Sequence, residues 1–245
     1  MTSRRVYRRE LSNSRLASFT VQVKESDLWV AVPPAALTAD LPARLETFIW
    51  RLRRSMEAYL RDHPHLTESL EPCLCGEDAP PVVQKMVVSA NRAGVGPMAA
   101  VAGAVAEAAG EYLQPHASEI IVENGGDIYL KITQPLQVGL YAGCSPFSGN
   151  LALLIRPDQS PLGICTSSGK VGPSLSLGRA DAAIAVSASA PLADAAATAL
   201  GNMVKGPGEL NRALDFARTI EGLSGALLIC ENKIAIWGDL ELQKL

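Results

Sequence analysis

The run EIIVENGGDIYLKI, residues 119–132, constrains the fold more strongly than any other part of the chain. Apolar stretches at 120–122 and 128–132 flank the tetrad Asn-Gly-Gly-Asp. Asn-Gly between two apolar stretches is the strongest short signal for a tight turn between antiparallel strands. The run therefore predicts a hairpin or a sharp bend, and it favours antiparallel pairing.

Other segments also have the periodicity of strands or helices. Residues 19–24 alternate apolar and polar side chains, as a half-buried strand does, and 27–32 continue in the same manner. Residues 41–60 repeat apolar side chains at helical spacing. We expect further strands at 137–141, 151–155, 162–166, 182–187 and, in two parts around Asn232, 225–237, and further helices at 82–109 (broken at 94–97), 191–204 and 211–217.

The order of these elements predicts the fold class. Strands that arrive in neighbouring pairs, mixed with helices, favour an α+β fold with an antiparallel sheet and packed helices over a doubly wound parallel fold. No low-complexity segment or obvious linker interrupts the chain. We therefore expect residues 1–245 to form a single domain.

Composition excludes some classes of partner. The net charge of −3 and the pI near 5.7 give no reason to expect nucleic acid. The longest uncharged small-apolar run, 93–106, contains glycine and proline and is too short to span a bilayer. No apolar signal-peptide segment follows the basic N-terminus, and five cysteines indicate reduced thiols. We expect a cytoplasmic protein without a membrane span.

Arginines are unevenly distributed along the chain. The ordinary interpretation of these clusters is a solvated basic face, and contact with an anionic ligand or partner is the alternative. The arginines concerned are Arg4, Arg5, Arg8 and Arg9 at the start and Arg44, Arg51, Arg53, Arg54 and Arg61 in the predicted helix 41–60.

Asp194 and Thr198 are the first candidate ligands for a metal ion. Spaced four apart in a predicted helix, they project from the same face. A carboxylate and a hydroxyl, completed by backbone carbonyls and phosphate oxygens, suit Mg²⁺. The alternative is structural: Thr198 bonds back to the preceding turn, and Asp194 in the first turn interacts with the helix dipole.

Two turns could approach a ligand. Glycines in the Asn124–Asp127 turn let the backbone come close to a bound group, although a plain hairpin turn explains them equally well. The string Thr166-Ser167-Ser168-Gly169 follows a predicted strand and could form an amide nest for phosphate. It is not a P-loop, because no Lys-Ser/Thr and helix follow it.

Histidines and cysteines offer two further hypotheses. His63 and His65 with Cys73 and Cys75 have the residue types of a zinc site, but their spacing does not match the common patterns. A thiol nucleophile would need a histidine brought to Cys144 or Cys165 by the fold, since none is near in sequence.

Several strings together resemble a known family. KESDL, AGVGPMAAVAGAVAE, VENGGDIYL, TSSGKVGPSLSLG and ADAAATALGN are similar to uncharacterised protein family 0280, over a region from about residue 19 to the C-terminus. That family resembles a divergent branch of the ApbE-like superfamily, whose main members are FAD:protein FMN transferases. The resemblance implies an α+β T-fold and, in the transferases, Mg²⁺-dependent transfer of FMN from FAD to a threonine of a target protein.

The resemblance also implies roles for particular residues. It implies FAD or FMN and Mg²⁺ as cofactors, a nucleotide ligand and an acceptor protein as partner. Separately, we expect a homo-oligomer. The flavin turn is Asn124, Gly125, Gly126 and Asp127, the phosphate turn is Thr166, Ser167, Ser168 and Gly169, and the metal ligands are Asp194 and Thr198.

Three positions depart from the transferase pattern. Pro173 stands about where the transferases have a histidine, and Met98 and Gly103 stand about where they have lysine and aspartate. Two hypotheses follow: an ApbE-like enzyme that transfers FMN, or a non-catalytic ligand-binding or assembly protein on the same scaffold.

Overall fold

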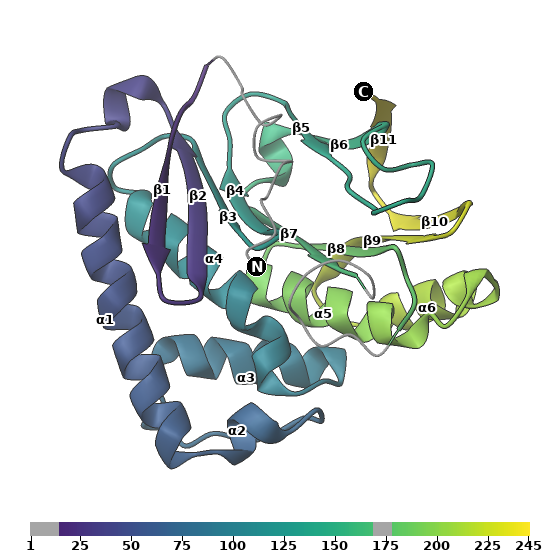
Figure 1. Ribbon diagram of the computed structural model, residues 1–245, viewed down its shortest axis with the longest axis horizontal. Coiled ribbons are helices and arrows are strands. Elements are labelled where there is room, and N and C mark those ends of the chain that lie inside the picture. Colours follow the sequence, from purple (N-terminus) through teal and green to yellow (C-terminus); the bar gives the residue numbers. More distant parts are fainter. Residues whose placement is uncertain (1–14, 169–177) are drawn as a thin grey trace.

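An eight-stranded sheet organises the molecule (Figure 1). The computed structural model describes residues 15–168 and 178–245, so Gly169 and Pro173 lie outside the described residues. Every pair of neighbouring strands in the sheet is antiparallel, which confirms the predicted fold class. In spatial order the strands are β1 (Ala17–Val23), β2 (Ser26–Val32), β3 (Ile120–Asn124), β4 (Asp127–Lys131), β7 (Leu162–Ser167), β8 (Ala182–Ser187), β9 (Leu223–Cys230) and β10 (Lys233–Gly238).

Helices cover one face of this sheet, and a small second sheet covers the other. The helices are α1 (Leu41–Asp62), α2 (His65–Glu68), α3 (Pro81–Ala93), α4 (Val101–Leu113), α5 (Ala190–Met203) and α6 (Leu210–Ala217), with short 3₁₀ turns η2 (Pro34–Ala36), η3 (Pro97–Ala100), η4 (Pro157–Gln159) and η5 (Pro207–Glu209). The second sheet has the order β11 (Glu241–Lys244), β6 (Leu151–Ile155) and β5 (Leu136–Gly139).

Alternating residues of one strand contribute to the cores on the two faces of the sheet. In β3, Ile120 and Val122 pack against the helix side, whereas Ile121 packs against the second sheet. Successive side chains of a strand point to opposite faces, so both faces of a central strand are apolar when both are covered. All five residues of β3 are buried, as this arrangement requires.

The bend between α3 and α4 positions the start of α4 near the sheet. Gly94 ends α3 in the left-handed conformation, with φ of 72°, and Pro97 opens η3. The sequence predicts a break at this Gly-Val-Gly-Pro string, and the structure confirms it. Among the described residues no single helix is long and apolar enough to cross a membrane, although Pro81–Ala93 and Pro97–Leu113 together have that length and composition across a bend of 104°.

Three details differ from the sequence-based expectation. Between the expected helices 41–60 and 82–109, where no element is expected, the chain forms the short helix α2, and β11 forms beyond the last expected strand. Arg53 does not belong to a solvated basic face: it is buried and donates to Ser26 Oγ (2.7 Å) and Glu57 Oε1 (2.8 Å), and it also contacts Glu25. A position on a surface helix can thus face inward when the neighbouring hairpin supplies acceptors.

Candidate functional site

Three hydrogen bonds join the segments that the sequence singles out. The backbone N–H of Thr166, in β7, donates to Asp127 Oδ1 at 3.3 Å. Asn124 Nδ2 donates to the carbonyl of Ala102 at 3.1 Å, and the N–H of Gly103 donates to Asp194 Oδ2 at 2.8 Å. The β3–β4 turn, the end of β7 and the facing parts of α4 and α5 therefore meet in one place, which we call the junction site.

The β3–β4 turn is a hairpin with a further role for its side chains. Gly125 and Gly126 have φ of 73° and 109°, a region that favours glycine, and Glu123 Oε1 accepts from the N–H of Gly126 at 2.7 Å. These features explain the glycines as turn residues. They do not explain Asn124 and Asp127, whose side chains bond to α4 and β7.

Asp194 is a buried carboxyl group. Its side chain lies in the second turn of α5, and burial raises its pKa well above the usual value. The neighbouring charge of Asp127 raises the pKa further, while hydrogen bonds from the backbones of Gly103 and Ala102 oppose the shift. No Lys or Arg among the described residues forms an ion pair with Asp194, so the charge of its ionised form is not neutralised there.

Thr198 lies one helical turn beyond Asp194 and is half-buried. Within residues 15–168 and 178–245 its hydroxyl has no hydrogen-bond partner, whereas Thr47 Oγ1 in α1 bonds back to the carbonyl of Ala43 at 2.9 Å. The structural alternative for this pair is therefore wrong in both parts. Thr198 does not bond back, and Asp194 binds the first turn of α4 and not its own.

The described part of the predicted phosphate turn lies at the end of β7. Thr166 and Ser167 pair with Ile184 and Ala183 of β8, and Ser168 follows the strand. Ser167 faces the last turn of α5, because a Cβ built on Gly201 would lie 3.3 Å from Ser167 Oγ. The structure thus places the backbone of Thr166 at the junction site and Ser167 against α5.

Gly103, which stands about where the transferases have aspartate, has no space for a side chain. A Cβ at this position would lie 2.4 Å from the carbonyl oxygen of Ala190 and 2.9 Å from Asp194 Cβ. An aspartate here cannot be accommodated without moving α5. Met98, in η3, is partly exposed and carries no charge.

Two further buried groups lie at the junction site: Glu107, which sequence reasoning did not single out, and the candidate nucleophile Cys165. Glu107 is 8% exposed, and its Oε2 accepts from the N–H of Ala190 at 2.8 Å. Its position as an acid within the small apolar run of α4 is the signal that could have identified it. Cys165 Sγ donates to the Ala190 carbonyl at 3.3 Å, and burial, with the charges of Asp127 and Asp194, raises the pKa of this thiol well above its usual value. A nucleophilic thiolate is disfavoured here.

The zinc hypothesis gains no support. His63 Nδ1 is 2.8 Å from the Tyr59 carbonyl, and His65 Nε2 is 3.3 Å from that of Leu74. Across residues 15–168 and 178–245, no three or more His, Cys, Asp or Glu side chains are grouped so that they could hold a metal ion. A cation at the junction site would consequently need hydroxyl, backbone or ligand oxygens besides its carboxylates.

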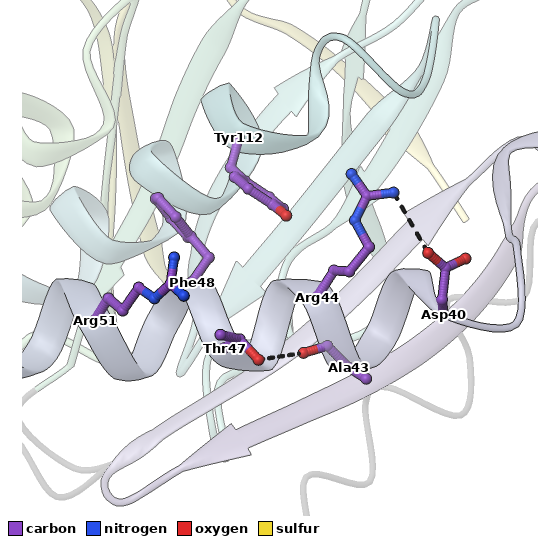
Figure 2. Close-up of a pocket in the computed structure, with 7 residues that line it drawn as sticks. All are labelled: Asp40, Ala43, Arg44, Thr47, Phe48, Arg51 and Tyr112. Carbon is purple, nitrogen blue, oxygen red and sulfur yellow. Dashed lines mark hydrogen bonds and ion pairs between the residues drawn. The ribbon is translucent and has the colours of Figure 1, made fainter.

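A groove lies between α1 and Tyr112 of α4 (Figure 2). The rings of Phe48 and Tyr112 stack with centroids 4.4 Å apart, and Arg44 lies within 3.5 Å of Asp40 and 2.9 Å of His116 Nε2. The groove encloses about 410 Å³ and is lined by Asp40, Ala43, Arg44, Thr47, Phe48, Arg51 and Tyr112. It shares no residue with the junction site.

Comparison with known proteins supplies the family. A family model described as AbpE bacteria matches residues 8–236. A UPF0280 protein of Methanocella arvoryzae is 46% identical over 200 residues, which cover 81% of each chain. Another of Methanosarcina acetivorans is 44% identical over 207 residues, covering 82% of this chain and 81% of that one. The chain belongs to the UPF0280 family.

Solved structures confirm the ApbE-like fold of this UPF0280 chain. The flavin transferase ApbE from Vibrio cholerae is similar with a TM-score of 0.60 at 15% identity, over 91% of this chain and 96% of that chain. The apo form of the Pseudomonas stutzeri flavinyl transferase ApbE is similar with a TM-score of 0.54 at 13% identity, over 91% and 93%. At these identities the likeness concerns the fold alone.

Proposed function

We propose that this UPF0280 protein binds a flavin nucleotide, FAD or FMN, together with Mg²⁺ at the junction site. The observation that carries the proposal is the buried carboxylate of Asp194, which has a second acid, Asp127, beside it and no basic partner among the described residues. Burying a charge without a partner is costly, and a bound cation removes that cost. Asp127 and Asp194 thus fit a site built for a cation.

The chemistry of the donors favours a hard cation. Asp194 supplies carboxylate oxygen, and Thr198 lies one turn further along α5 with its hydroxyl free within the described residues. A carboxylate offers about four acceptor positions, so the bond from Gly103 orients Asp194 without exhausting it. Mg²⁺ characteristically combines one or two carboxylates with phosphate oxygens and water.

A phosphate-bearing ligand suits the remaining surface. Thr166 brings its backbone N–H to Asp127, and Ser167, on the same face of β7 as Cys165, directs its hydroxyl toward the last turn of α5. Asn124 and the two turn glycines provide the adjoining wall, where backbone can approach a flat ring system. When bound, Mg²⁺ would neutralise phosphate charge and stabilise the charge that develops on a transferred phosphoryl group.

A second candidate function is a non-catalytic flavin carrier or assembly protein on this scaffold. Gly103 and Met98 favour it, because the first leaves no space for an acid and the second offers no cation. In FMN transfer the acceptor hydroxyl bonds to the FMN phosphorus, the pyrophosphate bond breaks, AMP leaves and the hydroxyl proton passes to water. A carrier would bind the nucleotide and leave this bond intact.

Flavin fluorescence tests the proposal directly. We expect FAD or FMN to be bound in Mg²⁺ and released on chelation with EDTA. The Asp194→Ala variant should lose the Mg²⁺-dependent part of the binding. Absence of binding by either flavin would refute the proposal. AMP release from FAD in the presence of a threonine-containing acceptor would identify the transferase, whereas binding without AMP release would identify the carrier.

A further inference from the structure

Helices α4 and α5 are joined by a reciprocal pair of hydrogen bonds. The N–H of Gly103 in α4 donates to Asp194 of α5, and the N–H of Ala190 in α5 donates to Glu107 of α4, each at 2.8 Å. In each helix the acceptor follows the donor by four residues. Each helix therefore uses a carboxylate of its second turn to bind the first turn of the other.

These amides are suitable donors for a structural reason. Gly103 is the third residue of α4 and Ala190 is the first residue of α5. The first four N–H groups of a helix have no partner within the helix, and they carry its partial positive charge. Acceptors in the partner helix satisfy these donors inside the protein, where water cannot.

Ala190 is also confined by its neighbours. A Cβ built on Gly163 of β7 would lie 2.4 Å from Ala190 Cα, and one on Gly103 would lie 2.4 Å from its carbonyl oxygen. Cys165 donates to the same carbonyl. Neither Gly103 nor Gly163 can carry a side chain at these separations, and their backbones fix the place at which α5 begins. The bond from Ala190 to Glu107 then fixes its direction.

We infer that Glu107 is a positioning residue, which holds the first turn of α5 so that the Asp194 carboxylate faces the cation. The inference rests on the proposed function, since it assigns Glu107 a part in that cation site. Glu107 acts through Ala190 and does not itself contact the cation. Only one turn of α5 separates Ala190 from Asp194, so a shift of the first is transmitted to the second.

Lys85, which is partly exposed, binds the other carboxylate oxygen of Glu107. Its Nζ donates to Glu107 Oε1 at 2.8 Å and to Glu111 Oε1 at 2.7 Å. Partial burial lowers the pKa of Lys85, but bonding to the two carboxylates outweighs it and raises the pKa overall. Glu111 is half exposed and also pairs with Lys85, yet its carboxylate does not bond to the start of α5. It is a matched control for Glu107.

The test measures Mn²⁺, which shares the oxygen-ligand preference of Mg²⁺, by electron paramagnetic resonance of the full chain. Glu107→Met keeps the side-chain length but removes the acceptor, and we expect Mn²⁺ affinity to fall by about 10- to 100-fold, as for outer-shell partners of metal ligands. Glu111→Met should leave it unchanged. Glu107→Gln keeps an acceptor for Ala190 and should recover most of the affinity. Leu66→Ala, which removes a fully buried side chain of α2, should lose stability but keep Mn²⁺ binding.

The outcomes distinguish failure of the cation site from failure of the role inferred for Glu107. Absence of Mn²⁺ binding by the unaltered protein would overturn the cation site and the inference together. Equal binding by the unaltered protein and Glu107→Met would overturn the inference alone. A loss in Glu107→Gln as large as in Glu107→Met would overturn the hydrogen-bond account. If Glu107→Met does not fold, Glu107→Asp replaces it, because the shorter side chain draws its carboxylate away from the Ala190 N–H. At a temperature well below unfolding we expect weaker Mn²⁺ binding in Glu107→Asp but not in Glu111→Asp, and equal binding in the two would overturn the inference.

Discussion

The junction site and the α1 groove hold charge in opposite ways. At the junction, Asp194 and Glu107 are buried and bound by backbone N–H groups. In the groove, Arg44 and Arg51 are exposed, beside stacked aromatic rings. Solvent screens these exposed arginine charges, so moving them costs little free energy. Burial, more than the density of charges, therefore decides how strongly a charged residue affects stability and binding in this protein.

Small residues make the junction possible. Around Asp194, α5 consists largely of buried alanines, and α4 approaches it at Gly103. Close approach of the backbones lets a short carboxylate reach the first turn of a neighbouring helix. The groove needs no such approach, because long arginine side chains extend over the surface there.

Gly103→Ala should give the largest effect. The added Cβ would lie 2.4 Å from the Ala190 carbonyl, so α4 and α5 must separate. Overpacking typically costs about 1–3 kcal/mol, which outweighs the gain of up to about 1 kcal/mol in helix propensity. We expect urea denaturation to show a net loss of stability, together with loss of cation binding.

Gly208→Ala is the control for that substitution. A Cβ on Gly208 meets nothing within 4 Å, so stability should be nearly unchanged. If Gly103→Ala proved as stable as Gly208→Ala, the close contact of the two helices would not be a constraint on the fold.

Asp194→Asn should separate stability from cation binding. The folded protein raises the pKa of Asp194, so the folded state retains a proton that the unfolded chain loses. Stability of the cation-free protein therefore falls as pH rises from the unfolded pKa, about 4, toward the folded pKa. The asparagine keeps an acceptor for Gly103 without this charge, and it should flatten that part of the profile in thermal denaturation.

Whereas Asp194→Asn should relieve the loss of stability at higher pH, it should lower the affinity for the cation. Loss of a direct carboxylate ligand should weaken Mn²⁺ binding by more than the roughly 10- to 100-fold typical of outer-shell partners. An Asp194→Asn protein that still bound Mn²⁺ normally would contradict the assignment of Asp194 to the cation.

Asp127→Asn should produce a smaller change, visible as a shift in pH dependence. Asp194 must ionise to bind a cation, so Mn²⁺ affinity should rise with pH through the folded pKa of Asp194. The charge of Asp127 contributes to the raised pKa, and its removal should move the rise to lower pH. Titrations of Mn²⁺ at several pH values check this, and an unchanged midpoint would show that the two acids do not interact.

Much of the fold, but less of the site, could be predicted from the sequence. The hairpin, α1 and β8 follow local rules of turn chemistry and periodicity, and β8 has the bounds expected for it. β11 has only four residues and depends on pairing with β6, so its short pattern carries little signal. The bond between Glu107 and Ala190 joins residues 83 apart, and Arg53 is buried by residues about 27 positions away. Such contacts depend on how elements pack together, which periodicity does not describe.

Arg51→Ala should have the smallest effect and completes the comparison. Arg51 is exposed in the groove, and surface substitutions usually change stability by no more than about 0.5 kcal/mol. The groove shares no lining residue with the junction site, so affinities for Mn²⁺ and flavin should also stay the same. Flavin titrations of Arg51→Ala and Asp194→Asn under the same conditions compare how the groove and the junction site contribute to affinity. If Arg51→Ala weakened flavin binding while Mn²⁺ binding was intact, the nucleotide would extend to the groove, and the two regions would form one site.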